Sequence, residues 1–238
     1  MNILRTIKRS IVRQLRPADR VQSRSTRPFS DVYGSDRGTP IDRYYIDDFF
    51  AAHAGDISGD VLEIQDGVYS RKYGSDIRAQ HVLDIDPQNE NATVVADLAV
   101  ADHIASDSYD CFVLPQTLQY VYDLRAAVRH AHRILKPGGM LLATVPALSR
   151  VDPGLFTSDY WRFTQASCER LFREQFGAQD LIISSFGNAL SCAGFISGMS
   201  VEEFSSSELD PVDSFFPMIL TIRARKSMRP EPAFRRHP

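Results

Sequence analysis

Short apolar runs alternate with helical patterns from residue 41 onward. The apolar runs occupy residues 61–64, 81–86, 93–98, 109–115, 140–146, 181–186 and 218–225. Most are continuously apolar rather than alternating, which is typical of strands that are buried on both faces. Helical patterns cover 41–57, 124–135 and 165–175, and an apolar segment follows at 189–199. This order predicts an α/β, Rossmann-like fold with a mostly parallel sheet and helices on both faces.

The direction of the last strand is left open by the sequence. A long connection precedes it, so it can enter antiparallel at the edge of the sheet. The helix at 124–135 is the best defined, because Leu124, Val128, Ala131 and Leu135 line one side of it. Pro137 and Gly138 follow immediately and are typical of a helix end.

Both ends of the chain are basic, whereas its middle is acidic. Residues 1–27 hold eight Lys or Arg and one acid, residues 223–238 hold six and one, and residues 28–222 hold 13 and 28. We therefore divide the chain into a basic N-terminal helix and linker (1–40), a main α/β domain (41–226) and a basic tail (227–238). Within the first part, residues 3–16 have the pattern of a basic amphipathic helix. Such a helix either makes weak contact with an anionic membrane surface or rests on its own domain.

Composition narrows the functional classes. The acidic middle argues against nucleic acid as the main ligand, because affinity for phosphate backbones comes mostly from Lys and Arg. The longest apolar runs are too short for a transmembrane helix, and the N-terminus lacks the apolar core of a secretory signal. The cysteines are odd in number and far apart, at Cys111, Cys168 and Cys192. A disulfide framework or zinc site is therefore not expected, and a cytoplasmic location is.

Acidic residues close three successive predicted strands. The first strand ends in Glu63 with Asp66 and Gly67 after it, the second in Asp84 and Asp86, and the third in Asp97 with Leu98. Ligands of an open α/β sheet bind beyond the carboxyl ends of its strands, and an acid about 20 residues after the first loop suits ribose hydroxyls. Each acid taken singly is equally typical of a helix N-cap. The three together favour a ribose-bearing ligand.

A resemblance names that ligand. "YDCFVLPQTLQYVYDLRAAVRHAHRILKPGGMLLATVP", residues 109–146, resembles the fourth-strand, helix and fifth-strand block of class I S-adenosylmethionine-dependent methyltransferases. In that family a Tyr-Asp pair opens the strand, and a helix ending in "LKPGG" precedes a strand closing in proline. The resemblance covers about residues 41–225. "GTPIDRYYIDDFF" (38–50) and "DYWRFT" (159–164) are more narrowly similar to small methyltransferases found near glycosyltransferases in bacterial polysaccharide clusters.

The resemblance implies a set of cofactor-binding positions. Glu63 and the backbone near Gly67 would surround the methionine part of S-adenosylmethionine, and Asp86, or second to it Asp84, would hold the ribose. Asp97 and Leu98 would meet the adenine, and Gln116 would lie by the sulfonium with Leu118. The cofactor-binding residues predicted in this way are Glu63, Asp66, Gly67, Asp84, Asp86, Asp97, Leu98 and Gln116.

The first loop departs from the family. The family's Glu-x-Gly-x-Gly-x-Gly is replaced by "EIQDGVY", residues 63–69, in which only the middle glycine, Gly67, is kept. Gln65 and Tyr69 therefore stand where glycines provide a positive φ and close helix packing. S-adenosylmethionine has no pyrophosphate, so it demands less of this loop than a dinucleotide does. The alternatives are a working loop and a loop that no longer binds the cofactor.

Acceptor-side candidates follow the fifth strand and open the domain. Asp159 is a candidate base or acceptor clamp, Trp161 can stack on a sugar, and Arg162 can hold a phosphate or carboxylate. Tyr44 and Tyr45 are candidate lid residues. The structural alternative is that these side chains belong to the core and that Arg162 pairs with an acid.

Three functions remain in competition. The first is methyl transfer from S-adenosylmethionine to a small-molecule acceptor, with a sugar or polysaccharide precursor as a candidate. The second is a methyltransferase fold that has lost catalysis and serves as a binding module or scaffold. The third, a nucleotide-dependent oxidoreductase, needs the missing glycine loop for its pyrophosphate and leaves "LKPGG" unexplained. The oligomeric state is not predicted.

Overall fold

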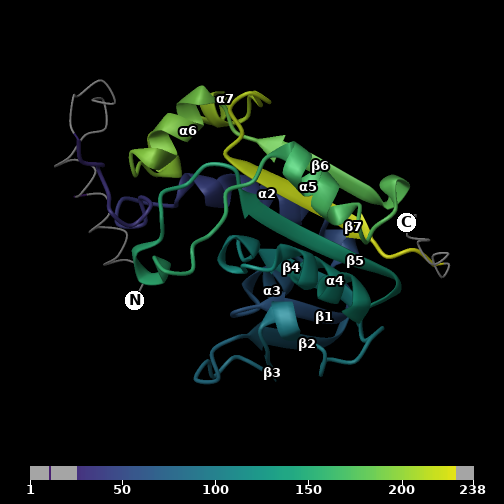
Figure 1. Ribbon diagram of the computed structural model, residues 1–238. Coiled ribbons are helices and arrows are strands. Elements are labelled where there is room, and N and C mark those ends of the chain that lie inside the picture. Colours follow the sequence, from purple (N-terminus) through teal and green to yellow (C-terminus); the bar gives the residue numbers. More distant parts are fainter. Residues whose placement is uncertain (1–10, 12–25, 229–238) are drawn as a thin grey trace, which may run out of the picture.

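A seven-stranded sheet forms the centre of the molecule (Figure 1). The computed structural model describes residue 11 and residues 26–228. The predicted basic helix at 3–16 and most of the basic tail therefore lie outside the described residues. The strands are β1 (Gly59–Ile64), β2 (Ile77–Asp84), β3 (Val94–Val95), β4 (Tyr109–Pro115), β5 (Leu135–Pro146), β6 (Leu181–Phe186) and β7 (Ile219–Arg225).

The strand order is β3-β2-β1-β4-β5-β7-β6. β1 to β5 are mutually parallel, whereas β7 runs antiparallel to both of its neighbours, β5 and β6. The predicted mostly parallel sheet is confirmed. The antiparallel last strand is confirmed as well, but its place at the edge is wrong: β7 inserts between β5 and β6, and β6 is the edge strand. A continuous apolar strand such as "MILTI" is suited to that interior position, because both of its faces are covered.

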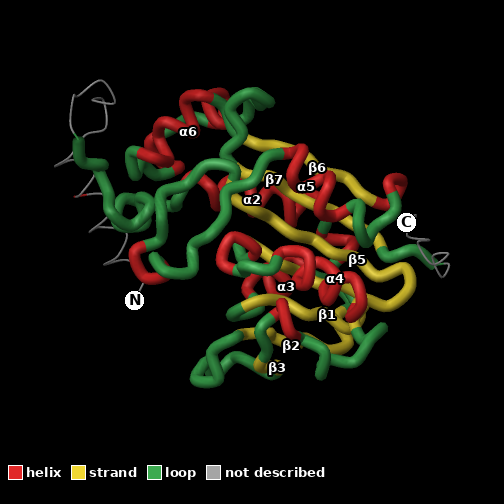
Figure 2. Tube along the Cα trace, viewed as in Figure 1, coloured by secondary structure: helices red, strands yellow, loops and turns green. Residues whose placement is uncertain are grey.

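Helices cover both faces of the sheet (Figures 1 and 2). They are α2 (Ile41–Ala52), α3 (Val68–Tyr73), α4 (Leu124–Ile134), α5 (Gln165–Phe172), α6 (Ala189–Ile196) and α7 (Ser206–Leu209). Successive residues of β4 point to opposite faces: Phe112 and Leu114 join the core under α4 and α5, and Cys111 and Val113 join the core under α2 and α6. All four are at most 1% exposed, which explains the unbroken apolar sequence of this strand.

The "LKPGG" string forms the first five residues of β5 and lies at the amino edge of the sheet. Gly138 has a φ of +83°, and a Cβ on Gly139 would lie 3.1 Å from the carbonyl oxygens of Tyr109 and Asp110. The predicted turn before the strand is therefore the irregular start of β5, where its register against β4 shifts between Tyr109 and Cys111. Lys136 from the same string donates to Asp60 at 2.6 Å and to Asp110 at 2.8 Å. This edge is therefore held together by charge-assisted hydrogen bonds between strands.

Residues 29–40, predicted as a linker or arm, pack along the segment that follows α6. The amide of Phe29 donates to the carbonyl of Ser197, and Pro40 forms an isolated bridge with Ser200. Arg37 is fully buried and forms an ion pair with Glu203. Within the described residues, no helix has the length and apolar character needed to cross a bilayer.

Candidate cofactor and acceptor site

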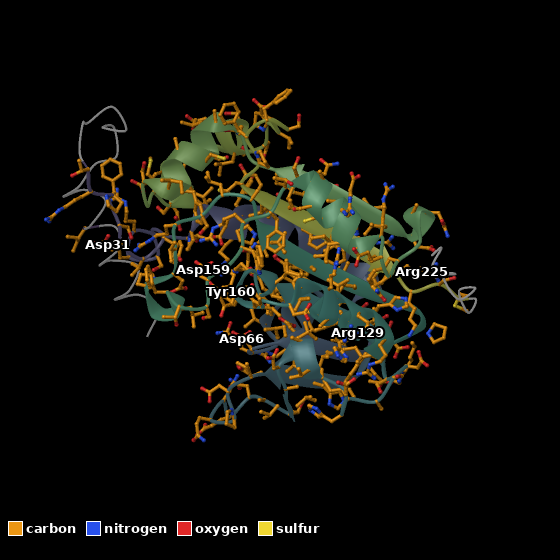
Figure 3. The ribbon with its side chains drawn as sticks, viewed as in Figure 1. Asp31, Asp66, Arg129, Asp159, Tyr160 and Arg225 are labelled. Atoms are coloured by element: carbon orange, nitrogen blue, oxygen red, sulfur yellow. The ribbon has the colours of Figure 1, made fainter. Side chains whose placement is uncertain are left out.

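The loops that follow β1, β2, β4 and β5 meet at the carboxyl edge of the sheet. Figure 3 shows Asp66, Asp159 and Tyr160 at this end of the molecule, and Arg225, the last residue of β7, at the opposite end. The N-terminal end of α2 lies at this edge too, because α2 leads through a short 3-10 helix into the first residue of β1 and so runs opposite to that strand. The topology therefore collects the predicted site residues at one edge.

The first loop keeps a glycine-type backbone without the glycines. Gln65 has a φ of +73° and Gly67 has a φ of +67°, so both residues are left-handed. A left-handed glutamine costs energy that a glycine does not, and such a cost persists where the surroundings enforce it. Here the Gln65 amide donates to Leu83 at 3.0 Å, and its carbonyl accepts from the Asn89 side chain at 2.6 Å. These bonds with Leu83 and Asn89 thus stabilise a left-handed turn at a position that has no glycine.

Glu63 acts within this loop. Its side chain is fully buried, and its two oxygens accept from the amides of Tyr69 and Ser70 at 2.8 and 2.7 Å. These amides belong to the first turn of α3, in which Asp66 Oδ1 also accepts from the Val68 amide at 3.2 Å. Burial raises the pKa of the Glu63 carboxyl, and the bonds from Ser70 oppose that rise. Glu63 therefore shapes the loop, and both of its oxygens are already engaged.

Tyr69 packs between α3 and α2. Its ring packs on Phe50 of α2 with 4.5 Å between centroids, and its hydroxyl accepts from Arg43 Nη1 at 3.1 Å. It joins the core between α2, α3 and the sheet rather than the open end of the loop. The residue that replaces the third glycine is thus accommodated by packing.

The two acids after β2 differ in how they are held. Asp84 ends the strand, and its Oδ2 accepts from Asn89 at 2.6 Å, the same side chain that binds the Gln65 carbonyl. Its Oδ1 accepts from the amide of Asp86 at 2.9 Å. Asp86 itself is exposed and accepts from the amide of Gln88. Asp84 is therefore the acid tied directly to the first loop.

Asp97 and Leu98 follow a strand of only two residues. Asp97 caps a short 3-10 helix by accepting from the amide of Ala99 at 2.8 Å, which is the structural role that its position allowed. Leu98 is buried in the core under α4. Ile85, between Asp84 and Asp86, is 67% exposed. Sequence reasoning did not select Ile85, although a lone apolar residue between two strand-end acids is a recognisable pattern.

Gln116 marks the end of β4. It has a φ of +43°, and its amide donates to the Thr144 carbonyl at 2.8 Å. Its own carbonyl accepts from the side-chain nitrogen of Gln119 at 2.8 Å, which fixes the orientation of that amide. The Gln119 oxygen is then buried without a hydrogen-bond partner among the described residues. Gln119 was missed by sequence reasoning, although a glutamine within the apolar "TLQYV" is an unusual signal.

The residues after β5 form a closed structural clamp. Asp159 has a side chain only 2% exposed, and its two oxygens accept from Arg162 at 2.5 and 2.9 Å. Arg162 lowers the pKa of the Asp159 carboxyl. Trp161 donates its indole N–H to the Val121 carbonyl and packs against the core. The structural alternative thus describes all three side chains better than base, sugar platform and anion clamp do.

Tyr44 and Tyr45 hold α2 to the segment around α7. The Tyr44 hydroxyl lies 2.5 Å from an Asp210 oxygen, and the buried Tyr45 hydroxyl donates to the Leu209 carbonyl at 2.8 Å. Their hydroxyls are thus committed to contacts around α7, and their role as acceptor-binding lid residues stays a prediction. Arg43, between Asp42 and Tyr44, turns toward α3 instead.

A polar cluster that the sequence did not predict lies beside this clamp. The Tyr120 hydroxyl donates to Asp152 Oδ2 at 3.4 Å, and Arg150 covers the ring of Tyr33 at 5.3 Å from its centroid. Burial and Asp152 together raise the pKa of Tyr33 to about 12. The same two causes, in the same order, raise the pKa of Tyr120. Both phenols are therefore neutral hydrogen-bond donors near one carboxylate.

A hollow outside the candidate site opens over β6 and β7 beside α2. It is lined among others by Phe49, His53, Ile182 and Arg223. Among residues 26–228, no group of three or more His, Cys, Asp or Glu side chains is arranged to hold a metal ion.

Comparison with known families supplies the decisive observation. Residues 54–143, from the end of α2 to the middle of β5, match the family model described as a methyltransferase domain. This segment is similar to methyltransferase domains. The match covers the first loop, the acids at the ends of β1, β2 and β3, and "LKPGG". It supports S-adenosylmethionine as the cofactor. No curated protein sequence is similar enough to the chain to count as a match.

Solved structures share the fold at low identity. An S-adenosylmethionine-dependent methyltransferase from Archaeoglobus fulgidus has a TM-score of 0.50 and 14% identity, covering 77% of this chain and 90% of its own. One from Mesorhizobium loti has a TM-score of 0.49 and 16% identity over 74% and 95%. One from Thermotoga maritima has a TM-score of 0.49 and 16% identity over 78% and 94%. At this identity the likeness concerns the fold.

Proposed function

We propose that the protein transfers a methyl group from S-adenosylmethionine to a small-molecule acceptor. The observation that carries the proposal is the methyltransferase-domain match over residues 54–143. That segment is the part of the sheet whose carboxyl edge gathers the first loop, Asp84 and Gln116. When bound, the cofactor supplies an electrophilic methyl group on a sulfonium, so the protein contributes mainly positioning.

Asp84 is our candidate for the ribose, with Asp86 as the second. Asp84 ends β2, and Asn89 links it to the carbonyl of Gln65 in the first loop. A carboxylate can accept more than one hydrogen bond per oxygen, so Asp84 can still receive a ribose hydroxyl. Ile85 and Val100, 67% and 64% exposed, offer apolar surface for a base beyond β2 and β3. Asp97 and Leu98 remain adenine-side candidates.

The first loop fits this cofactor better than it fits a dinucleotide. Its left-handed Gln65 and Gly67 preserve the turn, but α3 is only six residues long and Glu63 already accepts from two amides of its first turn. A pyrophosphate requires those amides as donors. S-adenosylmethionine places no phosphate there, so occupied amides do not exclude it.

Asp152 replaces Asp159 as our candidate proton acceptor. Asp159 is enclosed by Arg162, whereas in the described part of the chain Asp152 Oδ2 has the 3.4 Å contact with Tyr120 as its one hydrogen bond. A sugar hydroxyl acceptor needs a base, and the neutral phenols of Tyr33 and Tyr120 can donate to its other oxygens. Gln119, with an unpaired buried oxygen, offers an acceptor for an N–H or O–H of the substrate.

A sugar or polysaccharide precursor is the acceptor class that we propose. The sequence similarity of "DYWRFT" to methyltransferases of polysaccharide clusters supports it. An exposed aromatic pair adds to that support: Tyr122 and Tyr160 are 72% and 46% exposed, with ring centroids 5.3 Å apart. Exposed aromatic faces beside a site are suited to stacking against a sugar ring, the role that the sequence assigned to Trp161.

Isothermal titration calorimetry with S-adenosylhomocysteine, the demethylated cofactor, tests the proposal. We expect saturable binding to the wild-type protein and none of comparable strength for NAD. In Gly67→Val the new side chain meets both a left-handed backbone and the Gln80 side-chain nitrogen, which would lie 2.3 Å from the added Cβ. Its binding is expected to fall at least about tenfold. Absence of heat with the wild-type protein at millimolar ligand would favour a non-catalytic scaffold.

A further inference from the structure

Glu63 is already engaged at the place where the resemblance puts the amino-acid end of the cofactor. It is fully buried and bonded to two amides of α3. An α-amino acid carries an ammonium and a carboxylate, each of which is stabilised by a charged hydrogen-bond partner. The first loop supplies no cation within residues 63–70, so a cation from another element would complete the site.

Asp42 and Arg43 lie in the first turn of α2, beside the first turn of α3. The chain direction places this turn at the carboxyl edge, and the bond from Arg43 Nη1 to the Tyr69 hydroxyl connects it to the segment directly after Gly67. Lys72 of α3 also bridges to Asp47 of α2 at 3.0 Å. The two helices thus form one platform next to the loop.

Both side chains have unused hydrogen-bonding capacity. The Asp42 Oδ1 atom is buried and has no hydrogen-bond partner among the described residues. Among the described residues, the guanidinium of Arg43 makes one hydrogen bond, to Tyr69, and the side chain is 42% exposed. The two charges lie 3.9 Å apart, between Arg43 Nε and Asp42 Oδ2, which is beyond hydrogen-bonding distance. A buried acceptor without a donor is costly, so its retention calls for an explanation.

We infer that Asp42 and Arg43 together recognise the amino-acid end of the cofactor, Arg43 binding the carboxylate and Asp42 Oδ1 accepting from the ammonium. Asp42 and Arg43 are ligand-binding residues in this scheme, and Tyr69 is a positioning residue that orients the guanidinium. The inference rests on the proposed function, because it needs S-adenosylmethionine or its demethylated form as ligand.

The scheme also accounts for the electrostatics of Asp42. Burial raises the pKa of its carboxyl, and Arg43 only partly offsets that effect. An ammonium at Oδ1 would supply the missing positive charge and the missing donor at once. It also gives a role to Asp42 and Arg43 within the sequence "IDRYYID", whose two tyrosines are bonded to the segment around α7.

The test compares two ligands that differ in the amino-acid end. S-adenosylhomocysteine carries that end, and 5′-methylthioadenosine has the same nucleoside and sulfur without it. Calorimetry on the full chain should show that Arg43→Gln and Asp42→Asn each weaken S-adenosylhomocysteine at least about tenfold. Binding of 5′-methylthioadenosine should change less than about twofold. Arg173→Gln, which removes a cation from an exposed ion pair with Glu169 on α5, should leave both affinities unchanged.

The possible outcomes separate the role of Asp42 and Arg43 from the proposed methyl-transfer function. Equal weakening of both ligands in Arg43→Gln, or of neither, would overturn the inference while leaving the proposed function standing. If the wild-type protein bound neither ligand, the proposed function would fall and the inference with it. Arg43→Lys keeps the charge without the planar guanidinium, so a partial loss confined to S-adenosylhomocysteine is expected even if Arg43→Gln does not fold.

Discussion

At the scale of single residues, the strand-end acids divide into those that hold loops and those free to meet a ligand. Glu63 caps α3 and Asp97 caps a 3-10 helix, so both are structural as well as close to the site. Asp84 combines the two roles: Asn89 links it to the first loop, and it is also our candidate for binding the ribose. The acids therefore lie at the same carboxyl edge of the sheet but have different roles.

Asp84 and Asp86 can be separated by matched substitutions. We expect Asp84→Asn to weaken S-adenosylhomocysteine about tenfold, because a charge-assisted hydrogen bond to a ribose hydroxyl is lost. Asp86→Asn, at an exposed position two residues on, should weaken it less than about threefold. Calorimetry on both variants gives the comparison. A larger effect at Asp86 would restore the order that the sequence favoured.

Asp159 offers a second test at this scale. Its carboxylate is 2% exposed and bonded through both oxygens to Arg162, so Asp159→Asn should lower the free energy of unfolding by about 2 kcal/mol. Urea denaturation measures this, and S-adenosylhomocysteine affinity should be unchanged. If stability stayed the same while methyl transfer was lost, Asp159 would be the base that its sequence position suggested.

The sequence located residues well but not the directions of their side chains. Asp159, Arg162 and Trp161 do follow β5 at the carboxyl edge, yet Asp159 and Arg162 pair with each other and Trp161 bonds to Val121. Spacing along a loop carries no information on which neighbours its side chains will meet. Tyr44 and Tyr45 show the same limit, because their partners lie more than 160 positions away in the sequence.

At the scale of elements, the order of the strands along the chain was predicted because apolar continuity reports burial on two faces, but β5 begins at Leu135 rather than at 140 and β3 has only two residues. β4 and β6 have the expected bounds, and α4 ends one residue earlier than expected. The order of β6 and β7 in the sheet was not predictable from local pattern, since it depends on a pairing between β5 and β7 that is remote in sequence. The positive φ of Gln65 is likewise imposed by Leu83 and Asn89.

The helix α4 carries a pH-sensitive residue. Burial and Lys226 lower the pKa of His132 to about 4, against an opposing effect of Asp107, while its ring packs on Phe176 at 4.9 Å. Between pH 6.5 and 4 the unfolded chain binds a proton that the folded protein does not, so stability falls as pH falls through this window. The slope is at most about 1.4 kcal/mol per pH unit.

Removing the imidazole should remove that dependence. The free energy of unfolding of His132→Leu, measured by urea denaturation at about pH 7, 6 and 5, should fall less steeply than that of the wild type. The comparison is between slopes, because the substitution also changes packing against Phe176. Parallel profiles for the two proteins would show that His132 titrates in the folded state as it does in the unfolded chain.

At the scale of the whole molecule, the arm and the acceptor side depend on each other. Residues 29–40 pack along 197–203, and the same arm brings Tyr33 to Arg150 and Asp31 to the Arg150 guanidinium. The acceptor cluster is therefore assembled from segments far apart in the sequence, beside an edge built by β1 to β5. That distribution is why the resemblance of residues 109–146 implied a methyltransferase while the acceptor residues could not be identified from the sequence.

The buried pair Arg37–Glu203 is the contact on which the arm most depends. Arg37 is fully buried, and Glu203 also accepts from the Ser200 amide at 2.9 Å. Removing the charge of Glu203 takes away the ion pair of a fully buried Arg37, so Glu203→Gln should lower the free energy of unfolding by about 3 kcal/mol. Glu202→Gln is the matched control: Glu202 accepts from Thr39 at exposed positions, and its loss should cost less than about 1 kcal/mol.

Hydrogen exchange distinguishes release of the arm from general destabilisation. In Glu203→Gln, the amides of Phe29, Arg37 and Gly38, which donate to backbone carbonyls, should exchange faster by more than those of β4. Since β4 is buried at the centre of the sheet, its amides report global unfolding. An equal acceleration in both regions would mean that the pair stabilises the whole domain. Acceleration confined to the arm would mean that Arg37 and Glu203 hold Tyr33 over the acceptor side.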